Sequence, residues 1–177
     1  MPKSVEELIV RCQEDSTALE QLYRQRKKPV MGLAFGILQE VSLAEDCLQE
    51  TFLRLPSAAL RVKQTASGKA FILAIARNVA RELLRQHKNV NRQEELSEQA
   101  ATVPDMAEAV QVREMLRSLS AHQRELVVLH LYLGIPFAEI AALQHLPAST
   151  VRSRYAKTLK ILRKEWGNFD DEDSTDT

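Results

Sequence analysis

Carboxylate side chains gather in the stretch VSLAEDCLQETFLRL, residues 41–55. It contains Glu45, Asp46 and Glu50, directly follows Glu40, and repeats large apolar residues at the spacing of one helix face. Such a cluster can act in acid–base catalysis, bind a metal ion, bind a protein or stay solvated. Catalytic carboxylates usually need an apolar pocket that shifts their pKa values, and no feature of the sequence indicates one. An acidic face beside an apolar stripe instead favours a basic partner protein and repels DNA.

Basic side chains form two further clusters, although the chain carries 24 basic and 24 acidic residues and therefore no net charge. The first lies in residues 77–92, and four of its members recur at helical spacing: Arg77, Arg81, Arg85 and Lys88. The second lies in residues 149–166, where six basic residues stand against one acidic residue. Two basic helices favour contact with a polyanion such as nucleic acid at two places, and two solvated helix faces are the alternative.

The second basic cluster lies in a segment with the form of a helix-turn-helix, IPFAEIAALQHLPASTVRSRYAKTLKILRKEW. It predicts a short helix over 137–144, a turn at His145 and Leu146, and a second helix with Pro147 at its first position, where the missing N–H costs nothing. The buried face of this second helix is predicted to hold Val151, Tyr155, Leu159, Leu162 and Trp166. The opposite face carries Ser149, Thr150, Arg152, Ser153, Arg154 and Lys157. A helix of this width fits the DNA major groove, and a plain helical hairpin is the alternative.

The elements that must position these residues are predicted to be helices, because good helix formers dominate and the chain has only five Gly and six Pro. Capping-box patterns predict helix starts at Ser4, Ser42 and Ser120. Pro56 is expected to end the helix that starts at Ser42, with a loop after it, and Gly134 to end the helix that starts at Ser120. The predicted fold class is therefore all-α.

A polar segment without a clear apolar stripe divides the chain into two small helical domains joined by a linker. We predict a first helical domain over residues 1–86, a linker over 87–106, a helix-turn-helix domain over 107–166 and an acidic tail over 167–177. The tail is either a solubilising end or a regulatory element.

The sequence predicts no cofactor and no metal site. Cys12 and Cys47 are far apart, and the four histidines show no ligand spacing with either cysteine. There is no Gly-rich phosphate loop and no nucleophile elbow, so an enzyme is the last of the hypotheses. Because the sequence also lacks a signal-peptide pattern and any apolar stretch of about 18 residues, we expect a reduced, cytoplasmic protein without membrane insertion.

Three stretches carry a resemblance to a known family: AEDCLQETFLRL, AIARNVARELLR, and LSAHQRELVVLHLYLGIPFAEIAALQHLPASTVRSRYAKTLKILRK after the linker. Together they resemble the sigma-70 family of bacterial RNA polymerase sigma factors, in the short two-domain form of the extracytoplasmic-function (ECF) group. The resemblance covers about residues 19–166, with the motifs in the order and spacing of the family. It implies core RNA polymerase and promoter DNA as partners, and an anti-sigma factor as a further candidate partner.

The resemblance also implies roles for individual residues. The acidic helix of the family docks on the clamp coiled coil of the largest polymerase subunit, and the matching positions here are Asp46, Gln49, Glu50 and Phe52. The helix that faces the minus-ten promoter element and the loop before it, which captures a flipped base, correspond to Arg61, Lys63, Gln64, Arg77, Asn78, Arg81 and Arg85. In the recognition helix for the minus-thirty-five element, Arg152, Ser153, Arg154 and Lys157 are expected to contact DNA, with Ser149 and Thr150 on phosphate.

Several positions depart from the pattern of the family. Pro56 stands where Trp is common, and Gly68, Phe71 and Ala74 replace Phe, Trp and Arg. Aromatic rings stack on unpaired bases, and only 5% of this chain is aromatic, which predicts weaker or assisted promoter melting. Besides a sigma factor, two hypotheses stay open: a helix-turn-helix regulator that acts on duplex DNA without polymerase, and a degenerate sigma-like interaction module.

Overall fold

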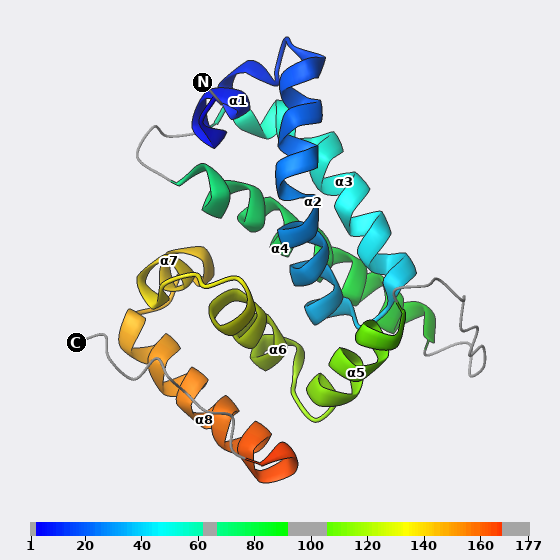
Figure 1. Cartoon of the computed structure of the whole chain (residues 1–177), viewed down its shortest axis with the longest axis vertical. Helices are drawn as coiled ribbons and strands as arrows, with labels where there is room; N and C mark the ends of the chain where they lie inside the picture. The colour runs from blue at the N-terminus through cyan, green and yellow to red at the C-terminus, as the bar shows by residue number, and fades with distance from the viewer. Residues whose placement is uncertain (1–2, 62–66, 92–105, 168–177) are drawn as a thin grey trace.

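The computed structural model describes residues 3–61, 67–91 and 106–167, which form helices joined by turns (Figure 1). In chain order the elements are α1 (Val5–Arg11), α2 (Ser16–Leu38), α3 (Val41–Ala59), α4 (Gly68–Asn91), α5 (Met106–Leu116), α6 (Ala121–Val127), η1 (Val128–Tyr132), α7 (Phe137–Gln144) and α8 (Ala148–Trp166). The element η1 is a π-helical turn that continues α6 directly. The prediction of an all-α fold is confirmed.

Helices α1–α4 form an N-terminal unit, in which α2, α3 and α4 pack on one another around an apolar core. Each helix contributes fully buried side chains to it, among them Leu8, Leu22, Leu33, Leu55 and Ile72. Burying a side chain of this size contributes about 1.5–3 kcal/mol relative to leaving it exposed. This core therefore fixes the relative positions of α3, which carries the acidic cluster, and α4, which carries the first basic cluster.

The predicted helix starts at Ser4 and Ser120 are confirmed, since each hydroxyl accepts the backbone N–H three residues on and the Glu or Gln at that position accepts in return. The predicted start at Ser42 is wrong. Helix α3 begins at Val41, with Glu40 at its N-cap, and the Ser42 hydroxyl donates to the Glu40 carboxylate at 2.8 Å instead of capping the helix.

Pro56 does not end α3, which continues to Ala59. Proline within a helix removes one backbone hydrogen bond and crowds the preceding turn. The last turn of α3 is nevertheless held in place, because Leu55 and Ala59 on either side of Pro56 are both buried in the core. The expectation of a loop directly after Pro56 was therefore wrong, because core packing outweighs the local effect of the proline.

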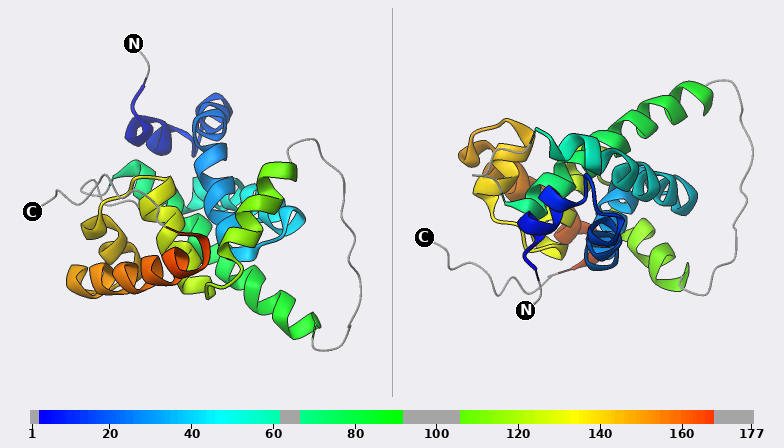
Figure 2. Two further views of the ribbon diagram at one scale, coloured as in Figure 1. Left: turned by 60° about the horizontal axis from the view of Figure 1, so that its bottom comes forward. Right: turned by 90° about the horizontal axis from the view of Figure 1, so that it is seen from above.

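Helix α4 continues five residues into the predicted linker and ends at Asn91, while α5 begins at Met106. Both views of Figure 2 show the C-terminal end of α4 extending beyond the rest of the molecule. Most of the predicted linker, residues 92–105, and the acidic tail from residue 168 onward lie outside the described residues.

The C-terminal unit consists of α5–α8 with η1, and α6, η1, α7 and α8 pack on one another. Its core includes Leu129, Ile140, Val151 and Leu162. Gly134 follows the end of η1 with a positive φ of 67°, as expected for a helix stop. The prediction that Trp166 is buried is wrong: it lies in the last turn of α8, beyond the last core contact at Leu162, and its side chain is exposed.

Candidate functional site

Helices α3 and α4 enclose an open groove of about 360 Å³ on the surface of the N-terminal unit. It is lined by Asp46, Gln49, Glu50, Leu53, Arg54, Val79, Glu82, Leu83 and Gln86. Asp46 and Gln49 are exposed, and Glu50 is partly exposed. Leu53 is unusual for a large apolar side chain, because it is 74% exposed. The groove thus combines acidic and apolar surface, and its exposed apolar residue, Leu53, lies outside the apolar stripe of α3, whose Phe52 and Leu55 are buried in the core.

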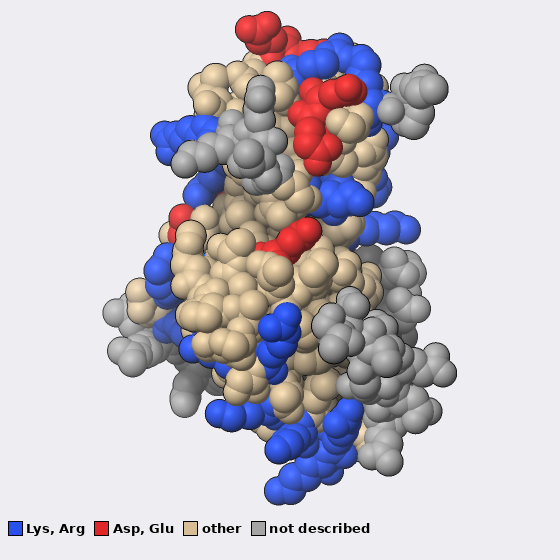
Figure 3. Space-filling model, turned by 90° about the vertical axis from the view of Figure 1, so that its left-hand side faces the viewer, with Lys and Arg blue, Asp and Glu red and all other residues tan. Residues whose placement is uncertain are grey.

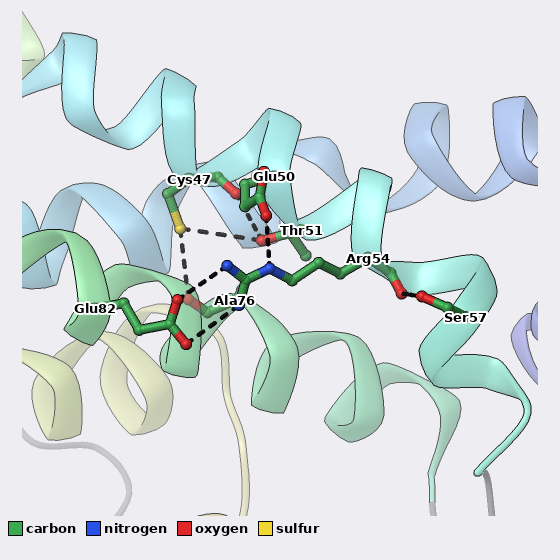
Figure 4. A network of polar contacts seen from close by, with 7 residues as sticks. All are labelled: Cys47, Glu50, Thr51, Arg54, Ser57, Ala76 and Glu82. Carbon is green, nitrogen blue, oxygen red and sulfur yellow. Dashed lines mark hydrogen bonds and ion pairs between the residues drawn. The ribbon is translucent and has the colours of Figure 1, made fainter.

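Arg54 organises the charges along the groove (Figure 4). Its guanidinium contacts Glu50 of the same helix at 2.6 Å and both carboxylate oxygens of Glu82 on α4, at 3.2 and 2.9 Å. The hydrogen bonds from Arg54 lower the pKa of Glu82, and those to Glu82 and Glu50 raise the pKa of Arg54. Sequence reasoning missed this residue, although the spacing of Glu50 and Arg54, four residues apart on a helix, was a usable signal.

Asp46 is the acidic side chain of the groove that stays free for a partner. Among the described residues none forms an ion pair with its carboxylate, whereas Glu50 and Glu82 are both held by Arg54. The negative charge offered to an incoming basic side chain is therefore concentrated on Asp46, beside the exposed Leu53.

Phe52 and the residues beneath the groove belong to the core. The Phe52 ring is buried and lies edge-on to Tyr23 of α2, with 5.1 Å between ring centroids. The Cys47 thiol donates to the Ala76 carbonyl at 3.4 Å, and burial raises its pKa to about 11. Cys47 therefore stays a protonated thiol and joins α3 to α4, and Phe52 packs α3 on α2 without lining the groove.

The basic stripe of α4 lies partly at the surface and partly between the two units. Arg85 and Lys88 are exposed, as is Asn78. The Arg77 side chain is only 11% exposed and pairs with Glu125 of α6, and Arg81 reaches the same carboxylate at 3.4 Å. Of the loop residues proposed from the resemblance, Arg61 is exposed, and Lys63 and Gln64 lie outside the described residues.

The outward face of α8 presents the residues predicted for DNA contact. Ser149, Arg152, Ser153, Arg154 and Lys157 are exposed, and Thr150 is partly exposed. Figure 3 shows Lys and Arg side chains gathered at the lower end of the molecule, where α8 lies, with most of the visible Asp and Glu at the upper end.

An aromatic cluster holds α8 on the rest of the C-terminal unit. The His130 ring stacks on Phe137 with 3.9 Å between centroids and meets Tyr155 of α8 edge-on at 4.7 Å. The Arg152 guanidinium lies 6.0 Å from the centroid of the Phe137 ring. These contacts join η1, α7 and α8, so they orient the face of α8 that carries the basic residues.

The turn between α7 and α8 differs in one respect from the prediction. Pro147 is the N-cap of α8 and not its first helical residue, because its ψ of 143° is extended and the helix begins at Ala148. His145 ends α7 in the left-handed conformation, with φ 54° and ψ 43°, a position that Gly commonly occupies.

This backbone geometry makes a prediction for His145. A residue other than Gly pays about 1–2 kcal/mol in the left-handed region, so His145→Gly is expected to raise the free energy of unfolding by about 0.5–1 kcal/mol, after allowing for the greater freedom of Gly in the unfolded chain. His145→Val should lower it, because a β-branched residue is least tolerated there. Urea denaturation followed by circular dichroism measures both, and shifts in the same direction would contradict this account.

Two other kinds of site find no support in the part of the chain that the structure describes. No group of His, Cys, Asp or Glu side chains in it is placed to hold a metal ion. Likewise, no helix within the described ranges is long and apolar enough to cross a membrane.

Comparison with known proteins identifies the family. A model described as Sigma-70 region 2 matches residues 22–90, and one described as Sigma-70, region 4 matches residues 109–162. The chain is 33% identical over 151 residues to the ECF RNA polymerase sigma factor SigC of Mycobacterium tuberculosis, covering 82% of this chain and 81% of that protein. It is 29% identical to the RNA polymerase sigma factor CarQ of Myxococcus xanthus, covering 86% of this chain and 91% of CarQ.

Solved structures agree on the fold. CnrH, in complex with the cytosolic domain of CnrY, superposes with a TM-score of 0.73 at 20% identity, covering 92% of this chain and 96% of CnrH. The sigma factor RpoE of Bartonella quintana, in complex with the anti-sigma factor NepR, gives a TM-score of 0.66 at 19% identity, covering 82% of this chain and 94% of RpoE. With both sigma-70 regions matched in order and a relative at 33% identity, the chain belongs to the sigma-70 family of RNA polymerase sigma factors, in its extracytoplasmic-function group.

Proposed function

We propose that this protein is a cytoplasmic sigma factor that binds bacterial core RNA polymerase and directs promoter-specific transcription initiation. The observation that carries the proposal is the occurrence, in one chain, of the matched sigma-70 regions 2 and 4. Its relatives SigC and CarQ are both named RNA polymerase sigma factors. The protein is thus an initiation factor and not an enzyme. An anti-sigma factor is a further partner, by analogy with the complex of RpoE and NepR.

The groove between α3 and α4 is the proposed polymerase contact. Its free carboxylate on Asp46 and its exposed Leu53 offer a charge and an apolar anchor side by side. Charge complementarity guides the encounter with a basic partner helix, and the apolar anchor supplies affinity. Gln49 and Glu50 complete this surface, with Glu50 positioned by Arg54, and Phe52 contributes from the core by packing α3 on Tyr23 of α2.

Promoter DNA is assigned to the two basic helices. The N-terminal unit, proposed to end near residue 86, presents α4 to the minus-ten element through Arg77, Asn78, Arg81 and Arg85, together with Arg61, Lys63 and Gln64 of the segment that precedes α4. The C-terminal unit, proposed to span residues 107–166, presents α8 to the minus-thirty-five element through Ser149, Thr150, Arg152, Ser153, Arg154 and Lys157. Residues between the units are the proposed linker, and residues 167–177 are the proposed acidic tail.

A matched pair of double variants tests the polymerase contact. Asp46→Arg with Leu53→Asp alters the groove. The control, Glu45→Arg with Leu60→Asp, makes the same changes at an exposed residue of α3 and at its exposed C-cap residue, neither of which lines the groove. Leu53 and Leu60 are equally exposed, at 74% and 73%. At the centre of an interface, loss of an apolar anchor together with reversal of a charge weakens the free energy of binding by about 3 kcal/mol, which is about 100-fold in affinity.

We expect the groove variant to lose about 100-fold in affinity for purified bacterial core RNA polymerase, and the control variant to bind like the wild type. Titration by fluorescence anisotropy measures both, with circular dichroism as the check on folding. Equal affinity of the two variants for polymerase would show that the polymerase contact lies outside the groove. Absence of binding by the wild-type protein would contradict the sigma-factor function and favour a helix-turn-helix regulator that acts on DNA without polymerase.

A further inference from the structure

Helix α1 packs against the start of α4 within the N-terminal unit. The backbone N–H of Gly68, the first residue of α4, donates to the carboxylate of Glu6 at 2.8 Å, although the two residues are 62 positions apart. A Cβ atom at Gly68 would lie 3.0 Å from Oε1 of Glu6, and 3.0 Å from side-chain carbons of Val5 and Ile9. Glycine at position 68 therefore allows α1 to lie directly on the backbone of α4.

Glu6 thereby caps α4 from another helix. The first backbone N–H groups of a helix have no partner within it, and the helix dipole favours a carboxylate there. The hydrogen bond from Gly68 lowers the pKa of Glu6, so this carboxylate is ionised at neutral pH. The cap from the adjoining chain is weak, because the Ser67 hydroxyl accepts from the Ala70 N–H only at 3.5 Å. Helix α1 therefore supplies the stronger of the two caps.

Helix α1 is itself well fixed in the N-terminal unit. Reciprocal hydrogen bonds between Ser4 and Glu7 close its start, and the side chains of Leu8 and Ile9 are buried in the core. Glu6, by contrast, is exposed and contributes a hydrogen bond to the packing instead of apolar surface. A substitution at Glu6 can therefore remove the contact with α4 and leave the core intact.

We propose that Glu6 is a positioning residue for the contact with single-stranded minus-ten DNA, because through Gly68 it fixes the point at which the chain enters α4. The inference rests on the proposed function, which assigns to that contact the residues that precede α4, namely Arg61, Lys63 and Gln64. At the other end of this segment the Arg61 N–H donates to the Ala58 carbonyl at 2.9 Å. An unstacked base gains contacts only from protein groups that are already held in place. Glu6 itself does not touch the DNA.

The negative charge of Glu6 has the opposite effect on DNA from its hydrogen bond. Besides the bond from Gly68, the charge of Lys69, an exposed residue of α4, lowers the pKa of Glu6. A purely electrostatic role predicts that removing the carboxylate strengthens DNA binding, since less negative charge faces the phosphates. A positioning role predicts weaker binding. Glu6→Gln separates the two, because its amide oxygen still accepts from the Gly68 N–H but carries no charge.

Four variants of the full-length protein test the proposal. Glu6→Ala removes both the hydrogen bond and the charge, and Glu6→Gln removes the charge alone. Gly68→Ala crowds the same contact from the side of α4, keeps the charge, and replaces a poor helix former by a better one. Glu14→Ala is the control, since it removes an exposed carboxylate from the turn between α1 and α2. Circular dichroism confirms that each variant is folded at the temperature of the assay.

The measurement is base preference on single-stranded DNA. The wild-type protein is assembled with purified bacterial core RNA polymerase and selects strands from a randomised single-stranded pool, with core polymerase alone as the background. Anisotropy titrations then give the affinity of each variant holoenzyme for the selected strand and for its single-base changes. We expect Glu6→Ala and Gly68→Ala to weaken binding of the selected strand about tenfold and to reduce the discrimination between bases. Glu6→Gln and Glu14→Ala should stay within about twofold of the wild type, as should the affinity of every variant for polymerase.

Each remaining outcome overturns the inference in a different way. Unchanged affinity and base preference in Glu6→Ala would remove Glu6 as a positioning residue and leave the proposed function intact. Stronger binding by both Glu6→Ala and Glu6→Gln would assign an electrostatic role instead. An equal loss in Glu6→Gln and Glu6→Ala would show that the hydrogen bond to Gly68 is not what matters.

Failure of the proposed function is recognised separately. A wild-type holoenzyme that selects no sequence above the background of core polymerase would contradict both the positioning role and the minus-ten assignment on which it rests. A wild-type protein that does not bind polymerase would contradict the sigma-factor function itself.

Discussion

Leu129→Ala is expected to lower the free energy of unfolding by about 3 kcal/mol, within the range of about 2–5 kcal/mol for leucine-to-alanine changes in packed cores. Leu129 is 0% exposed and lies in η1, which packs on α6 and α7 of its own unit and on α2. The substitution removes apolar surface and leaves a cavity that the surrounding helices cannot fully close. Urea denaturation, followed by circular dichroism and by fluorescence of Trp166 in α8, measures the change.

The control for this prediction lies two residues away. Leu131 belongs to the same element but is 52% exposed, so Leu131→Ala should change the free energy of unfolding by less than about 0.5 kcal/mol. A similar loss for both substitutions would mean that η1 does not bury the side that carries Leu129. It would also contradict the placement of the aromatic cluster that orients α8.

Replacing Arg152, Arg154 and Lys157 together by Ala is expected to weaken binding of the protein to duplex DNA by about 100-fold and to lower the salt slope by up to about 3. The three side chains are exposed in the N-terminal half of α8, whose start enters a major groove first. Removing three positive charges releases fewer counterions on binding, so the loss should be largest at low salt. Anisotropy titrations of a labelled duplex between about 50 and 200 mM salt measure both quantities.

An equal loss of charge elsewhere provides the comparison. Arg24, Lys27 and Lys28 are three exposed basic residues of α2, in the other unit. Their replacement by Ala changes net charge as much and should alter DNA affinity by only a few-fold, through the general field of the protein. If the two triple variants lose affinity to the same extent, net charge and not the face of α8 determines binding.

Local signals in the sequence were sufficient for most of the helices. Caps at Ser4 and Ser120, the apolar spacing of α3 and α4, and the turn at His145 were all recognisable because each depends on residues within a few positions. The predicted helix start at Ser42 was wrong because the Ser42 hydroxyl donates to the nearby carboxylate of Glu40 instead of capping the helix. The predicted helix end at Pro56 was wrong because the buried residues on either side of it hold the last turn of α3 in helical form.

The contacts between the units could not be predicted, because they join residues far apart in the chain. Arg77 and Glu125 are 48 positions apart, and nothing near Glu125 in the sequence indicates that it is buried. The DNA-facing assignment of Arg77 and Arg81 came from the family resemblance and from their place in a basic stripe, and neither indicates what covers these side chains in the folded protein. Gly32 and Gly36 were a usable signal, since two glycines one turn apart in a helix indicate close approach of another helix.

Gly36 of α2 lies against Val128 of η1, since a Cβ atom at Gly36 would lie 2.5 Å from a methyl carbon of Val128. This fit has a consequence for how this protein and its relatives diverge. The space between α2 and η1 is shared by two positions, so a side chain gained at position 36 has to be matched by one lost at position 128 for the units to stay together. Lineages that keep the carboxylate at position 125 are therefore expected to vary positions 36 and 128 in concert. Lineages that lose that carboxylate are released from the constraint, and position 36 should then drift toward ordinary helix formers such as Ala.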